Sequence, residues 1–120
     1  MLRENDVLRH ICRGALDYVY PDGPIREECI RVKFPQNADQ VAAICKHLEE
    51  DDCIYMTTER VSESWPDVTG WKLTEKGLQS DIFEEALSEA AEEYADMVGM
   101  SVADTKGLIR PARMRKAGAV

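Results

Sequence analysis

The stretch 37-NADQVAAICKHLEEDDCIYMTTERVSESWPDVTGWKLTEKG-77 decides the fold. Asn37 is a favourable helix cap, and the apolar residues after it recur at helical steps, at Val41, Ile44, Cys45 and Leu48. Cys53–Thr58 is rich in β-branched and aromatic residues, and Trp71–Thr74 alternates apolar with polar residues, so both segments are typical of strands. The serine, proline and aspartate residues between positions 61 and 68 are typical of a loop. This pattern predicts a helix over Ala38–Glu50 followed by a two-stranded hairpin.

The segments before Asn37 predict one clear helix and one ambiguous element. From about Asp6 to Tyr20 the apolar residues keep a helical spacing, and two prolines and a glycine at positions 21–24 end the helix. Residues 24–34 fit a short helix, because Pro24 suits a first helical turn. The same residues also alternate in a strand pattern, at Ile30, Val32 and Phe34. We favour the helix and keep the strand as the alternative.

The segment after Gly77 predicts a long helix and a basic tail. The helix starts near Ser80 or Asp81 and ends at about Val98, where Gly99 suits the C-cap. One face of this helix is an apolar stripe, and the other consists of acids. Residues 101–120 hold five basic residues against one acid, a net charge of +4, together with glycines and a proline. They predict a loose tail.

The order helix, short element, helix, hairpin resembles the winged helix-turn-helix superfamily. The resemblance covers about Val7 to Gly77. Its most specific part is the passage from LEEDDCIY at residues 48–55 to GWKLTEKG at residues 70–77, where a helix ends in a polar turn and the returning strand closes in a Leu-Thr-x-x-Gly phrase. The resemblance implies an α+β, mostly helical fold of three helices and a β-hairpin wing, followed by a long C-terminal helix. Together with the segments after Gly77, the expected organisation is a winged-helix domain over 1–78, a C-terminal helix over 79–99 that is a candidate for dimerisation and a basic flexible tail over 100–120.

Composition and charge narrow the function classes. The 120 residues are 44% hydrophobic and 32% charged, which is ordinary for one globular domain. No apolar run approaches the roughly 18 residues of a membrane span, and the polar N-terminus lacks the apolar core of a signal peptide. We therefore expect a cytoplasmic protein without a membrane partner. The net charge is −8, from 23 acids and 15 basic residues, so the body of the protein repels nucleic acid at long range.

Neither a metal nor a catalytic site is predicted. Cys12, Cys29, Cys45 and Cys53 have no Cys-x-x-Cys spacing and lie among apolar neighbours, so we expect buried, reduced thiols, with zinc bound together with His10 or His47 as a minor alternative. The sequence has no glycine-rich phosphate loop and no nucleophile elbow. We therefore expect neither an enzyme nor a cofactor.

The resemblance implies DNA binding and a role as a transcriptional regulator. In DNA-binding members the second helix of the helix-turn-helix enters the major groove and the wing contacts the backbone. Carried over here, Ala38–Glu50 is that helix, with Asp39, Gln40, Ala43, Lys46 and His47 facing solvent. The tentative DNA-binding residues are Gln40, Lys46 and His47 on this helix, Arg60 and Lys72 in the wing, and Arg31 and Lys33 before the turn.

The acidic balance favours a second hypothesis, a non-catalytic protein-interaction module on the same scaffold. Its extreme form is an acidic DNA mimic, such as a phage-type inhibitor. We also expect a homodimer, because the alanine-rich stripe of the last helix permits close helix approach. The tentative dimerisation residues are Phe83, Leu87, Ala90, Ala91 and Tyr94. The alternative is that this stripe packs on the first helix of the same chain.

The two tryptophans carry different expectations. Trp71 lies on an alternating strand, so we expect it in the core. Trp65 lies in a polar loop beside Pro66, where it is either a contact residue at the wing tip or a lid folded back on the domain.

Overall fold

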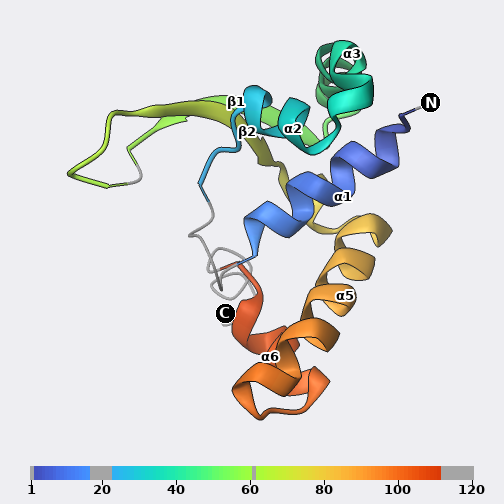
Figure 1. The fold of residues 1–120 in the computed structure, drawn as a ribbon, viewed down its shortest axis with the longest axis vertical. Helices are drawn as coiled ribbons and strands as arrows, with labels where there is room; N and C mark the ends of the chain where they lie inside the picture. Colours follow the sequence, from blue (N-terminus) through green and yellow to red (C-terminus); the bar gives the residue numbers. More distant parts are fainter. Residues whose placement is uncertain (1, 17–22, 61, 112–120) are drawn as a thin grey trace.

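The computed structural model describes residues 2–16, 23–60 and 62–111. In these ranges the fold is α+β and mostly helical, with one antiparallel pair of strands. The elements are α1 (Glu4–Ala15), α2 (Glu27–Lys33), the 3-10 helix η1 (Pro35–Asn37), α3 (Ala38–Glu50), β1 (Ile54–Glu59), β2 (Val68–Leu73), α4 (Glu75–Leu78), α5 (Asp81–Val98) and α6 (Val102–Ile109). Figure 1 shows α1 between α2 and α3 on one side and α5 on the other, with the β1–β2 hairpin projecting away from the helices.

Helix α1 lies at the centre of the core. Its apolar residues are spaced so that one continuous face is buried, by Val7, Leu8, Ile11, Cys12 and Ala15. This face contacts α3, α5 and β2, so the residues that the sequence predicted as a helical stripe form the common wall of the domain. The helix begins two residues before the predicted start. Its predicted last turns, residues 17–20, lie outside the described residues.

Residues 24–34 combine both elements that the sequence allowed. Glu27–Lys33 forms helix α2, as favoured. Ile25, just before it, pairs with β2: its amide donates to the Trp71 carbonyl at 2.9 Å, and the Trp71 amide donates to the Ile25 carbonyl at 2.8 Å. The strand character is therefore confined to one residue, and Ile30 and Val32 belong to the helix, the first buried and the second exposed.

The hairpin has a regular register of six pairs, from Ile54 opposite Leu73 to Glu59 opposite Val68. Trp71 is buried, as predicted, and its indole N–H donates to Glu27 Oε1 at 3.2 Å. The second strand begins at Val68, three residues earlier than predicted, so the connecting loop is shorter. Trp65 in that loop is 67% exposed. It is not a lid.

Helix α5 has the predicted boundaries and caps. The Ser80 hydroxyl accepts from the Phe83 amide at 3.2 Å, and Gly99 adopts the left-handed conformation at φ 68°. The apolar stripe packs inside the chain, where α5 contacts α1 and α6 and where Phe83, Leu87, Ala90 and Ala91 are buried. Tyr94 is partly buried against the same core. The stripe therefore satisfies the alternative of packing on the first helix, and its buried residues leave little surface for a dimer.

The prediction of a loose tail from residue 101 is wrong for Val102–Ile109, which forms α6. The Ser101 hydroxyl caps this helix by accepting from the Asp104 amide at 3.1 Å, and Ile109 is completely buried. The glycines and basic residues of this segment are typical of a loose tail. The helix depends on a few buried side chains rather than on a broad apolar stripe that the sequence pattern would reveal. The remaining tail residues, 112–120, lie outside the described residues. In the described part of the chain, no helix combines the length and the apolar character needed to cross a membrane.

Gly70 provides a test of the contact between Ile25 and β2. A Cβ at this position would lie 2.4 Å from the Ile25 carbonyl oxygen, a backbone atom that cannot move without breaking the pairing with Trp71. We expect Gly70→Ala to lower the free energy of unfolding by about 2–3 kcal/mol, as overpacking does. Gly107→Ala is the control, because nothing lies within 4 Å of its added Cβ on α6. It should stabilise by about 0.5–1 kcal/mol. Urea titrations followed by circular dichroism measure both, and equal effects would contradict the assignment.

Candidate functional site

The exposed side of α3 is the surface that the sequence predicted to bind DNA. Val41, Cys45 and Leu48 turn inward and are buried. We call the opposite side the α3 face; its exposed residues are Asp39, Ala42, Ala43, Lys46, His47, Glu49 and Glu50. The solvent-facing positions predicted from the sequence are confirmed for Asp39, Ala43, Lys46 and His47.

The prediction is wrong for Gln40. This side chain is partly buried, and its Oε1 accepts a hydrogen bond from the backbone amide of Leu2 at 3.3 Å. The N-terminal residues before α1 thus engage the amide group that would read an adenine edge. Gln40 fixes the start of the chain on α3.

His47 is engaged from the same direction. Its Nδ1 contacts Glu4 Oε1 in the first turn of α1. This hydrogen bond and the charge of Glu4, with smaller contributions from Glu50 and Asp51, raise the pKa of His47 above its ordinary value. When His47 is protonated, its positive charge is therefore offset by the Glu4 carboxylate that already contacts it.

The cations before α3 differ in their partners. Arg31 Nη1 lies 3.2 Å from Glu27 Oε2, one helical turn away, and the other oxygen of Glu27 holds the Trp71 indole. Arg31 is therefore part of the contact between α2 and β2. Lys33 is exposed. Burial lowers the pKa of His10, and the charge of the nearby Lys33 lowers it further.

Both predicted cations of the hairpin also lie beside acids. Lys72 Nζ lies 3.3 Å from Glu59 Oε1, and the Lys72 side chain is only 11% exposed. Arg60 Nε lies 3.5 Å from Asp67 Oδ1 across the base of the loop, with both side chains largely exposed. The second pair is weaker, because exposed ion pairs contribute little and are screened by salt.

The α3 face and the turn after it are strongly acidic. The turn adds the exposed residues Asp51 and Asp52 to the carboxylates of Asp39, Glu49 and Glu50. Lys46 is the only lysine or arginine among them. The surface that should approach phosphates in a DNA complex therefore carries five carboxylates, the Lys46 ammonium group and a histidine paired with Glu4, and the Lys76 ammonium group donates to the Asp51 carbonyl at its edge.

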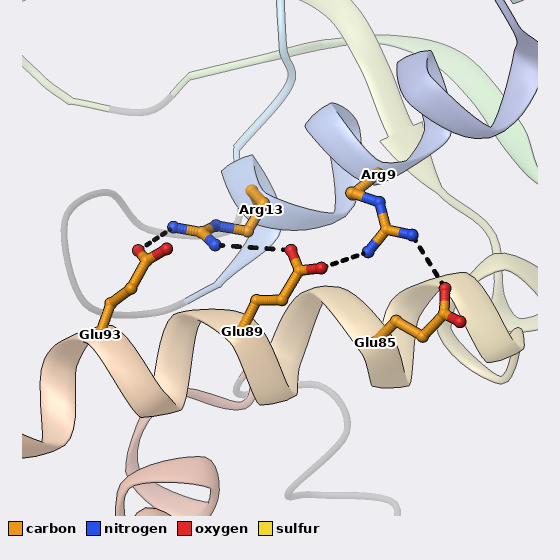
Figure 2. A network of polar contacts seen from close by, with 5 residues as sticks. All are labelled: Arg9, Arg13, Glu85, Glu89 and Glu93. Atoms are coloured by element: carbon orange, nitrogen blue, oxygen red, sulfur yellow. Dashed lines mark hydrogen bonds and ion pairs between the residues drawn. The ribbon is translucent and has the colours of Figure 1, made fainter.

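A second polar cluster joins α1 to α5 (Figure 2), and the sequence reasoning did not anticipate it. Arg9 contacts Glu89 at 2.8 Å and Glu85 at 2.9 Å, while Arg13 contacts Glu93 at 2.7 Å. The signal was present, because two arginines four residues apart face three glutamates at the same spacing. Beside the cluster lies an open cavity of about 410 Å³, whose lining includes His10, Lys33 and Phe34. The cations and carboxylates that line this cavity nearly balance. The ion pairs explain Glu85, Glu89 and Glu93 as side chains that hold α5 against α1.

The cysteines are only partly as expected. Cys12 and Cys45 are buried, and burial raises the pKa of each thiol to about 12. Cys53 is partly buried and Cys29 is exposed, which corrects the expectation of four buried thiols. Among the described residues, no three His, Cys, Asp or Glu side chains are grouped to hold a metal ion.

Comparison of the chain with models of protein families, with curated proteins and with solved structures found no match.

The contact between His47 and Glu4 predicts a pH dependence of stability. A histidine whose pKa is raised on folding stabilises the fold fully below its unfolded value of 6.5, and this stabilisation is lost as the pH rises through the raised folded pKa. His10 behaves oppositely, because its pKa is lowered. We expect Glu4→Gln to lose stability relative to the parent at pH 5.5 and to approach it at pH 8.5. Denaturant titrations at both pH values measure this, and NMR should show His47 titrating above His10. A His47 pKa at its ordinary value would contradict the contact.

Proposed function

We propose that this chain is a non-catalytic protein-interaction module on a winged-helix scaffold, whose α3 face binds a basic surface of a partner protein. The order of elements supports the scaffold: α1 is followed by Ile25, which pairs with β2 as an isolated β-bridge, and then by α2, α3 and the hairpin. The β1–β2 hairpin corresponds to the wing, and α3 to the helix that DNA-binding members place in the major groove.

The charge of the α3 face carries the proposal. Non-specific affinity for DNA comes from cations that neutralise phosphates, and binders make several such contacts. Here five of the seven candidate residues are engaged within the chain: Gln40 with Leu2, and Arg31, His47, Arg60 and Lys72 each with a carboxylate. Lys33 and Lys46 remain, and they oppose the five carboxylates on and after α3.

The same surface suits a basic partner. Carboxylates spaced along a helix attract arginine and lysine side chains, as phosphates do along a nucleic acid strand. Ala42 and Ala43 leave the middle of the face flat, so that a partner surface can approach the helix closely. The exposed Trp65 adds the type of side chain most enriched among residues that dominate binding energy, at the tip of the wing.

Reversing charge on the α3 face should separate the two functions. We expect Glu49→Lys/Glu50→Lys to abolish retention of a basic partner in affinity capture from the source cell. Glu92→Lys/Asp96→Lys makes the same change in charge on exposed positions of α5, outside the proposed surface, and should leave retention intact. Circular dichroism verifies the fold of both variants.

DNA binding is the outcome that would overturn the proposal. We expect no retardation of random duplex DNA by the full chain in low salt. Retardation that Lys46→Ala removes would assign the α3 face to DNA. Equal loss of the partner by the two charge-reversed variants would instead show general attraction to an acidic protein.

A further inference from the structure

The cavity beside the α1–α5 ion pairs has walls from three helices. Helix α1 supplies lining residues at three- and four-residue steps, from Asp6 to Arg13, and α5 supplies two glutamates. The third wall is the end of α2, with its last residue Lys33 and its C-cap Phe34. Pro35 disfavours a helical conformation of the residue before it, so the helix ends there. The volume of about 410 Å³ falls within the roughly 300–1,000 Å³ of small-ligand pockets.

The charged groups of the α1 and α5 walls are engaged within the chain. Figure 2 shows Arg9 and Arg13 directed at glutamates of α5, where ion pairs to Glu89 and Glu93 engage both. The Asp6 carboxylate accepts a hydrogen bond from the N-cap amide of α1 at 3.2 Å. None of these groups can bind a ligand without losing a contact that holds the fold.

The groups around the end of α2 are not engaged in this way. Lys33 is exposed and, within the described residues, forms neither an ion pair nor a hydrogen bond. His10 is partly buried, and neither of its ring nitrogens has a hydrogen-bond partner among these residues. Phe34 contacts the imidazole edge-on, with the ring centroids 6.0 Å apart and the planes at 82°. An ammonium group, an imidazole and an apolar ring therefore meet at this wall with polar atoms free for a ligand.

The sign of the local charge favours an anion. Among charged groups, Lys33 has the largest effect on His10, and together with burial it lowers the pKa of that imidazole. His10 is therefore neutral at pH 7 and can donate one N–H, while Lys33 supplies the positive charge. One free ammonium and one neutral N–H match the single charge and two oxygens of a carboxylate. A phosphate group would bring additional negative charge to a cavity whose other cations are paired.

We propose that this cavity binds a carboxylate that carries a neighbouring apolar group. The carboxylate lies between Lys33 and His10, and the apolar group lies against the partly buried ring of Phe34. A small organic acid and the last residue of a peptide both have this chemistry. None of the lining residues belongs to the α3 face, so the site does not depend on the proposed function. The net charge of −8 opposes an approaching anion, and physiological salt screens that repulsion beyond about 8 Å.

N-acetyl-leucine and N-acetyl-leucinamide test the requirement for charge, because they differ only in the carboxylate. We expect N-acetyl-leucine to shift the NMR signals of His10, Lys33 and Phe34 saturably, with millimolar affinity, since so small a ligand makes few contacts. The amide should bind about tenfold more weakly or less well still. Sodium chloride at equal ionic strength separates binding from screening. Equal binding of the acid and the amide would overturn the proposal, and so would the absence of a saturable shift.

A third ligand distinguishes the two sources of the carboxylate. A short peptide that ends in leucine presents the same terminal group with further backbone beside it. Tighter binding of the peptide than of N-acetyl-leucine supports a peptide terminus as the ligand, and equal or weaker binding supports a small acid.

Substitutions of Lys33 test the residue that supplies the charge. Lys33→Gln should weaken binding of N-acetyl-leucine about tenfold, whereas Lys33→Arg, which keeps the charge, should retain most of it. Lys106→Gln removes a lysine on α6, outside the cavity lining, and should leave binding unchanged. The bound carboxylate should also raise the pKa of His10, so affinity should increase as the pH falls from 7.5 to 5.5. Unchanged affinity in a folded Lys33→Gln variant would overturn the assignment, as would a His10 pKa that the ligand does not move.

Discussion

The burial of one face of α1 is the constraint on which the rest of the structure depends. A helix of 12 residues presents its apolar stripe to α3 and β2 on one side and to α5 on the other. Two helix layers and a hairpin are thereby closed around one helix, and each would expose its own apolar face without it. The arginines at the border of this stripe, Arg9 and Arg13, then reach the glutamates of α5 and fix how that helix lies against α1 (Figure 2).

The same helix determines the chemistry of the α3 face. The residues around its start lie beside α3, where the Leu2 amide bonds to Gln40 and Glu4 contacts His47. Two of the three groups on α3 that could have read bases are therefore engaged in holding the N-terminus in place. The packing of the N-terminus against α3 thus determines which side chains of α3 are available to a ligand: Gln40 and His47 are already bonded within the chain.

The elements with long periodic patterns were predictable from the sequence. The stripes of α1, α3 and α5 survive as buried faces, and the caps at Ser80 and Gly99 hold because capping depends on local backbone groups. Helix α6 was missed because three-dimensional contacts, such as the burial of Ile109, stabilise it despite Gly107. The superfamily resemblance remains a proposal.

The candidate site was less predictable than the fold, for a physical reason. A positively charged residue in a sequence has no visible partner, and the partners here lie 43 residues away for His47 and 13 for Lys72. Net charge counts acids and cations without placing them, and only the folded chain shows that they lie together rather than on opposite sides. Arg31 illustrates the exception, because its partner Glu27 is four residues away on the same helix and the spacing alone indicates the pair.

The acids at the end of α3 are arranged against local stability, which bears on their role. Glu49, Glu50, Asp51 and Asp52 lie at the negative end of a helix dipole, where each carboxylate is unfavourable by a few tenths to about 1 kcal/mol. The fold compensates locally: Lys76 Nζ donates to the Asp51 carbonyl at 2.7 Å, and the Cys53 amide donates to the Leu48 carbonyl at 3.0 Å. The backbone of the turn is thus held by other groups, and in the described structure none of these four side chains takes part in a hydrogen bond or an ion pair. Departures from local consistency of this kind are expected where a surface serves binding rather than folding. The acidic end of α3 thus makes no side-chain bond within the described structure, as the proposed contact with a basic partner requires.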